Sequence, residues 1–371
     1  MKSKSLLPLL FVLICFLLWL SPGAAAQEID QEEELLEKSG ANEMYESLNE
    51  ETRELLSHAG VQGAGETGEG EGWFAVLSGL LREKLSGPLK ALAALLAVIV
   101  LCRLANCFDS AEIGSAAGFA GALACAVITV TPLLELMESA KRAIEGASVF
   151  LLASVPVYGA LMAASGSAAA GTSYSFLTLA AGNVIPVLSM TLVFPLLHGI
   201  LAFSLMASVS QVKLDRVLSS VYGFSKWLLV LAVTVFSGVL SVQTALNAQV
   251  DAASNKAMKL LASSAIPIVG GAFGDAVAAI QNSVHIVKSG VGAFGILAAL
   301  CIFAPAALEA GAWIGICSMG QIAGDLFEMP KLSSFLGMCA SVARMILAVI
   351  ASVCAVSVVS AAIVLFVKGS L

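Results

Sequence analysis

Long apolar runs with few charges between them are the feature that most constrains this chain. From residue 89 onward these runs are about as long as the roughly 20 apolar residues that a helix needs to cross a bilayer. Over the whole chain, 58% of the residues are hydrophobic and 12% are charged, whereas a soluble domain has about 25% charged residues. Backbone amides in lipid must be satisfied within the chain. The sequence therefore predicts an all-α polytopic membrane protein.

We expect about seven to eight transmembrane helices in the polytopic domain, residues 89–371, since each needs about 20 apolar residues. The segment 176–207 is too long for one straight crossing and contains Pro186 and Pro195, so we expect a broken helix or a hairpin there. The predicted spans are residues 89–105, 114–134, 147–168, 176–207, 227–248, 290–317 and 340–367, with an interrupted piece at 261–280.

A ridge of small residues at Gly114, Gly118 and Ala122 lies in the second of these spans. Small residues at this spacing let helices approach closely. The ridge fits packing within the chain, and it also fits a homo-oligomer or a partner helix.

The segment from Gln243 to Gly295 is neither a regular span nor an ordinary loop. Residues 243–261 have helical periodicity with a polar face, and residues 266–275 are apolar but contain one proline and three glycines and end in an acid. Irregular backbone at membrane depth is tolerated only where protein or water satisfies it, and such segments often line solute paths. We therefore predict a broken or re-entrant helix. Its candidate conduit residues are Gln243, Asn247, Asp251, Pro267, Gly270, Gly271, Gly274 and Asp275.

The N-terminus, residues 1–26, has the pattern of a signal peptide. Two lysines precede an apolar run, and small residues follow it up to Ala26, where we predict cleavage. An uncleaved anchor is the competing interpretation. Residues 27–72 carry 14 acids and 2 bases, so we expect an acidic extracytoplasmic segment that ends in a flexible Gly/Glu-rich linker. This segment is either a solvated surface or a docking element for an extracytoplasmic partner.

Residues 73–88 have the composition of an interfacial amphipathic helix. An exported N-terminus would place the following loop, with Arg103, Asp109 and Glu112, in the cytoplasm. If residues 176–207 form a hairpin, residues 249–289 lie largely outside. The bases lie scattered at the ends of spans and form no basic stripe, which argues against a nucleic-acid surface.

Catalytic and metal-binding patterns are missing from the sequence. The three histidines lie far apart, and neither a G-x-S-x-G elbow nor a Walker A loop is present. The cysteines lie in or beside apolar runs, so we expect buried, reduced thiols. Gly274-Asp275 resembles an intramembrane aspartyl protease site, but no second aspartate lies in an obvious neighbouring span. We expect no enzyme activity and no cofactor.

Ionisable residues inside apolar runs are better functional candidates, because a charge at membrane depth is costly unless it is paired or meets water. Asp275, Glu309 and Arg344 are such residues. We predict that Glu309 and Arg344 pair across two helices and that Asp275 faces a polar path. The alternative is that Glu309 and Arg344 lie near the ends of spans and extend their charged groups to the interface.

Three stretches carry a resemblance to a known family, namely Val242-Gln243-Thr244-Ala245, Ile266-Pro267-Ile268-Val269-Gly270-Gly271-Ala272 and Val291-Gly292-Ala293-Phe294-Gly295-Ile296. Together with the acidic N-terminus and the polytopic domain, they make the chain resemble the stage III sporulation protein AE family of endospore-forming bacteria. The resemblance is most specific between Val242 and Gly295.

This resemblance implies a subunit of the channel-like apparatus that joins mother cell and forespore, in the mother-cell-derived outer forespore membrane. Besides the lipid bilayer, the implied partners are other stage III sporulation membrane proteins, ring-forming proteins and a cytoplasmic secretion-type ATPase. The resemblance supplies no catalytic residues.

Two other functions fit the sequence. An independent ion-coupled secondary transporter would use Asp275 and the broken helices as its coupling site, and it would work without partners. A non-conducting membrane anchor would recruit partners through the acidic segment. Replacing Gly270 and Gly271 by leucine separates a conduit from an anchor, because only the anchor should tolerate the change.

Overall fold

The computed structural model describes residues 41–61, 63, 72–105, 111–164, 184–209, 216–236, 238–239 and 270–366. Over these residues the chain forms helices joined by turns, which confirms the all-α prediction. The predicted signal peptide lies outside them, and so does much of the predicted span at 227–248. Six helices in the described part are long and apolar enough to cross a membrane, namely Trp73–Ala105, Gly118–Ala164, Val184–Ala207, Arg216–Phe236, Val287–Leu326 and Pro330–Leu365.

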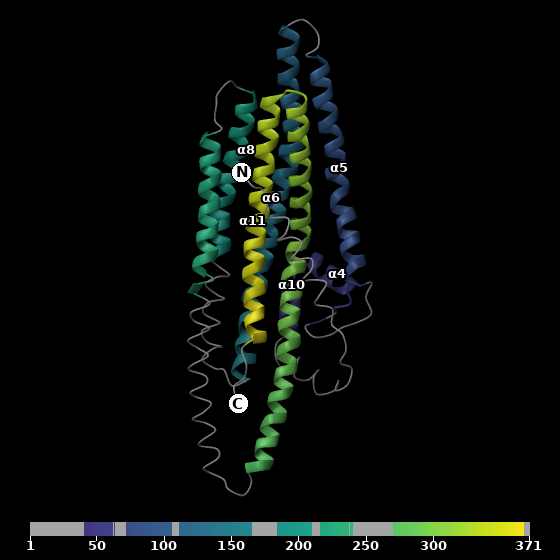
Figure 1. Ribbon diagram of the computed structural model, residues 1–371. Coiled ribbons are helices and arrows are strands. Elements are labelled where there is room, and N and C mark those ends of the chain that lie inside the picture. The colour runs from purple at the N-terminus through teal and green to yellow at the C-terminus, as the bar shows by residue number, and fades with distance from the viewer. Residues whose placement is uncertain are drawn as a thin grey trace.

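Helices α10 (Gly270–Leu326) and α11 (Pro330–Phe366) form an antiparallel hairpin along the long axis of the molecule (Figure 1). The short turn between them places Glu328 in the left-handed region, with a φ of 58°. A Cβ added at Gly324 would lie 3.1 Å from backbone atoms of Ser333, and one at Gly292 would lie 2.8 Å from the side chain of Leu365. Glycine therefore allows close packing at both ends of the hairpin.

Helix α6 (Ala111–Ala164) is continuous over 54 residues, or about 81 Å at 1.5 Å per residue. The predicted spans at 114–134 and 147–168 are therefore not separate helices over the described residues. The polar stretch between them consists of good helix formers, and it contains an ion pair between Glu138 and Lys141, three residues apart, at 2.5 Å. Nothing in this stretch ends the helix.

Helix α5 (Trp73–Ala105) likewise continues through Pro88, which lies inside the helix. The structure thus merges the predicted interfacial helix at 73–88 with the first predicted span. α5 packs against α6 and α10.

The hairpin considered for residues 176–207 is wrong over residues 184–207, which form one helical segment. A π-helical turn, η1 (Ser189–Val193), leads into α8 (Phe194–Val209). Pro195 has no N–H for the carbonyl of Thr191, and in the π turn the N–H of Phe194 donates to the carbonyl of Ser189, five residues earlier. The π turn accommodates the proline without reversing the chain.

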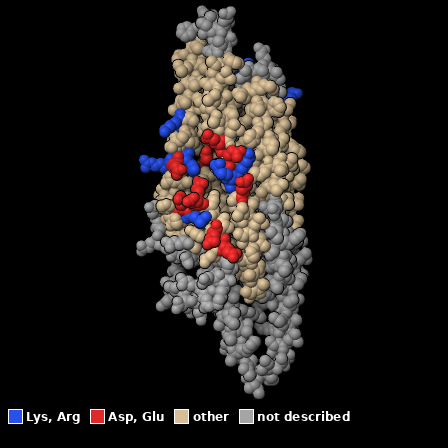
Figure 2. All heavy atoms as spheres, turned by 180° about the vertical axis from the view of Figure 1, so that it is seen from behind, with Lys and Arg blue, Asp and Glu red and all other residues tan. Residues whose placement is uncertain are grey.

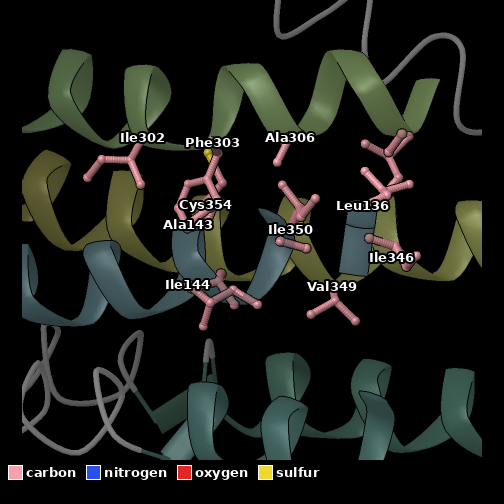
Figure 3. Close-up of a cluster of buried hydrophobic side chains, with 14 of the residues drawn as sticks. Leu136, Ala143, Ile144, Ile302, Phe303, Ala306, Ile346, Val349, Ile350 and Cys354 are labelled. Carbon is pink, nitrogen blue, oxygen red and sulfur yellow. The ribbon is translucent and has the colours of Figure 1, made fainter. Parts of the chain in front are cut away.

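The apolar core lies where α6, α10 and α11 meet (Figure 3). Apolar side chains from the three helices fill this space and are almost completely buried. Those labelled in Figure 3 are Leu136, Ala143 and Ile144 from α6, Ile302, Phe303 and Ala306 from α10, and Ile346, Val349, Ile350 and Cys354 from α11. This core holds α10 rigidly and fixes which of its residues reach the surface.

Candidate functional site

Glu309 is the only charged residue of α10 between Lys288 and Asp325. It is half-buried, in the middle of a helix that is otherwise apolar on both sides of it. Pro305, four residues earlier, lacks an N–H, so the carbonyl of Cys301 loses its usual helical partner. The acid therefore lies next to a weakened turn of the central helix.

Charged side chains from three other helices act electrostatically on Glu309. They are Lys84 of α5, Glu51 of α4 (Glu50–His58), and Glu135 and Arg142 of α6. The Nζ atom of Lys84 lies 3.7 Å from a carboxylate oxygen of Glu51 and 3.7 Å from one of Glu83. Lys84 thus joins the groups around Glu309 to the N-terminal helix α4.

We call Glu51, Glu83, Lys84, Glu135, Arg142 and Glu309 the charged cluster. Figure 2 shows acids and bases gathered at mid-height on one face, with largely uncharged surface above them. Four acids and two bases give the charged cluster a formal charge of −2. The carboxylates of Glu51 and Glu83 are 57% and 73% exposed, so their ion pairs with Lys84 contribute at most about 1 kcal/mol each. The charged cluster therefore forms a polar site but contributes little to the stability of the fold.

Chemically, a half-buried carboxylate within electrostatic range of a lysine and an arginine can exchange a proton or hold a cation weakly. A bound metal needs several ligands around one point. The described residues contain no group of three His, Cys, Asp or Glu side chains that could hold a metal ion. The arrangement around Glu309 therefore suits charge compensation along a helix bundle better than metal chemistry.

Helices α3 (Ala41–Glu46) and α4 belong to the acidic segment and pack against α6 and α10. Met44, Leu48 and Leu56 are at most 2% exposed, while the glutamates of both helices are exposed. Asn49 caps α4 by accepting a hydrogen bond of 3.1 Å from the N–H of Thr52. This packing was not predicted from the sequence, although the apolar residues Met44, Leu48 and Leu56 recur among the acids of this segment. They do not share one helix, because Met44 belongs to α3, Leu48 to the following turn and Leu56 to α4.

Arg344 does not pair with Glu309. The two residues form no ion pair in the part of the chain that the structure describes. Arg344 of α11 acts instead on Tyr222, in the helix Arg216–Phe236, and on Cys317 of α10. The two charges lie at similar distances from the α10–α11 turn but have different neighbours, because their helices turn them toward different parts of the bundle.

The predicted conduit residues fall into two groups. Gln243, Asn247, Asp251 and Pro267 lie outside the residues that the structure describes, as does the predicted cleavage site at Ala26. Gly270, Gly271, Gly274 and Asp275 lie in the first two turns of α10, which are continuous with the rest of the helix. A break in this segment can only precede Gly270, so the prediction that these residues line a path remains a prediction.

The stretch Val291–Ile296, which the sequence analysis singled out, packs inside the bundle. The ring of Phe294 lies 6.3 Å from that of Phe150 on α6 and 6.2 Å from that of Tyr45 on α3. A Cβ at Gly295 would collide with the hydroxyl of Tyr158. This stretch is therefore a contact point of α3, α6, α10 and α11.

Comparisons with known proteins agree with the resemblance. The model of the family described as stage III sporulation protein AE matches residues 60–368. A curated protein of Bacillus subtilis (strain 168), "Stage III sporulation protein AE", is 24% identical over 242 residues, which cover 64% of this chain and 61% of that protein. The match thus spans less than two thirds of the relative's length. No solved structure matches the chain.

Proposed function

The chain belongs to the stage III sporulation protein AE family, a family of sporulation proteins, and on this premise we propose that it is a conduit or transport subunit of the channel-like complex between mother cell and forespore. The observation that carries this proposal is the family match over residues 60–368, which includes all six apolar helices. We place the protein in the outer forespore membrane, because its six long apolar helices suit a membrane protein.

The proposed role is not enzymatic. The complex would consist of this chain, other stage III membrane proteins and ring-forming proteins, with a cytoplasmic secretion-type ATPase as the energy source. Glu309 supports a transport role over a purely structural one, because a half-buried acid in an apolar bundle is costly and is typically kept for function.

A paired substitution tests this role in the spore-forming host. We expect Glu309→Gln to lower the yield of heat-resistant spores by at least tenfold, with normal abundance and normal co-purification of partners. Glu145→Gln, an exposed acid of α6 outside the charged cluster, is the matched control and should sporulate normally. Normal sporulation of both variants would remove Glu309 from the proposed mechanism.

The two alternatives have separate tests. An ion-coupled transporter should take up solute when it is reconstituted alone in vesicles with an ion gradient, whereas a subunit should be inactive without its partners. A non-conducting anchor should retain sporulation after Gly270 and Gly271 are both replaced by leucine. Loss of sporulation with the complex still assembled would favour the conduit.

A further inference from the structure

Charged residues divide the long helices into two apolar zones. At one end, near the α10–α11 turn, Arg103 donates to a carboxylate oxygen of Glu328 at 3.2 Å, next to Asp325. From Glu309 to Asp325 there are 16 residues along α10, and from Lys84 to Arg103 there are 19 along α5. At 1.5 Å per residue these stretches span about 24 and 29 Å. We call the part between the charged cluster and the turn the near zone.

The part of the bundle on the other side of the charged cluster is the far zone. It contains residues 146–164 of α6, 289–308 of α10 and 345–366 of α11, none of which is charged. Each stretch is roughly 30 Å long. Both zones therefore match the roughly 30 Å hydrocarbon core of one bilayer, and together they are about twice as long as that core. Composition alone does not show which of the two zones lies in the bilayer.

Helices α3 and α4 make the distinction, because they cover part of the far zone. Tyr45 of α3 reaches Phe294, which lies 15 residues beyond Glu309 in the direction away from the turn. That separation is about 22 Å along α10. Glu43 and Glu46, on either side of Tyr45 in α3, are exposed, whereas Glu51 of α4 belongs to the charged cluster.

Exposed carboxylates at this depth are incompatible with surrounding acyl chains, because ionised side chains in the membrane face protein or water. We propose that only the near zone is embedded in lipid, and that the far zone, although equally apolar, projects from the bilayer on the side of residues 41–61. The charged cluster then lies at the level of the lipid headgroups. Lys90, the one charge of α5 within the near zone, lies six residues from Lys84 and extends its exposed chain toward that level.

The exposed apolar side chains agree with this division. In the near zone they include large residues such as Phe119, Met319 and Ile322, which are 50%, 54% and 67% exposed. On the far-zone parts of α6 and α11 they are Val149, Leu152 and Val359, at 53%, 38% and 44%. Phe74 of α5, ten residues before Lys84 on the far side of the charged cluster, is 80% exposed. On α6, α10 and α11, by contrast, the near zone presents the more exposed apolar surface, as a lipid-facing surface does.

Two positions on α6 test the proposal. Val127 in the near zone and Val149 in the far zone are 71% and 53% exposed valines of the same helix. We would introduce Val127→Cys or Val149→Cys into the full chain with Cys15 and Cys107 replaced by serine. The six remaining cysteines are buried, and the protein without an added cysteine measures any background labelling. An environment-sensitive fluorophore is attached to each variant, and each is reconstituted in phosphatidylcholine vesicles.

The readout is quenching by phosphatidylcholine with brominated acyl chains. We expect the label at Val127 to lose most of its fluorescence and the label at Val149 to keep it. Equal quenching at both positions would overturn the proposal, and so would quenching at Val149 alone. Val359→Cys provides an independent far-zone position on α11, where we also expect no quenching, so the test does not depend on the folding of one variant.

Discussion

Replacing Gly295 by alanine tests whether the close packing inside the bundle is as tight as the structure indicates. The added Cβ would overlap the hydroxyl oxygen of Tyr158, and it would lie 3.1 Å from Cζ of the same ring and 3.2 Å from Cβ of Ala361. Tyr158 is 1% exposed, so its ring has no free space into which it can move. Either α10 or the ring must shift.

Overpacking of this kind costs about 1–3 kcal/mol. It outweighs the gain of about 0.5–1 kcal/mol that alanine normally brings over glycine within a helix. Gly311→Ala is the matched control on the same helix, because a Cβ there meets no atom within 4 Å. We therefore expect the two substitutions to change the free energy of unfolding in opposite directions.

Titration of the purified protein with sodium dodecyl sulfate, followed by circular dichroism, measures this free energy. Tyr158→Phe removes the oxygen that the new Cβ would meet, so it should recover a large part of the loss in the Gly295→Ala background. Equal stability of Gly295→Ala and Gly311→Ala would show that α6, α10 and α11 pack less closely than described. If Tyr158→Phe recovers no stability in the Gly295→Ala background, the added Cβ does not clash with the Tyr158 hydroxyl.

Three further predictions concern the packing and the turn. Phe294→Ala should lower the free energy of unfolding by about 3–5 kcal/mol and expose residues 41–61 to protease, because its ring joins α3 to α6; Phe119→Ala, at a position 50% exposed, should do neither. Glu328→Gly should leave the free energy of unfolding in the detergent titration equal or higher. Relief of the left-handed φ is worth about 1–2 kcal/mol, whereas the exposed ion pair with Arg103 that is lost contributes at most about 1 kcal/mol. Glu328→Val should lower the free energy of unfolding. A maleimide should modify Cys102, Cys125, Cys301, Cys317, Cys339 and Cys354, which are all buried, only after denaturation, as mass spectrometry of the intact protein would show.

The sequence predicted the class of fold because hydropathy and charge act over whole segments. Runs without charge, such as residues 113–134, are helical wherever the structure describes them. Boundaries within α5 and α6 were predicted less well. Pro88 and the charges of residues 135–145 suggest interruptions, yet a helix can continue through both when flanking turns pack against neighbours.

The candidate site was predicted only in part. Glu309 stands out in the sequence because it is an isolated acid in an apolar run, but its neighbours come from residues about 170 to 260 positions earlier in the chain. Sequence spacing carries no information on such distant contacts, and pairing Glu309 with the nearest basic residue of the next span gave the wrong partner. The contact between α3 and Phe294 was missed for the same reason.

The position of α10 in the chain has a consequence for biosynthesis. α10 contacts α4, α5, α6 and α11, yet its first residue, Gly270, is made only after almost three quarters of the chain has been synthesised. Until then, α4, α5 and α6 lack the part of their packing surface that α10 provides. The turn between α10 and α11 is short, so closing it costs little entropy and the two helices can pair as one unit. The helices made earlier can then pack against this hairpin. A ribosome that stops before Gly270 would release a set of helices without their common scaffold.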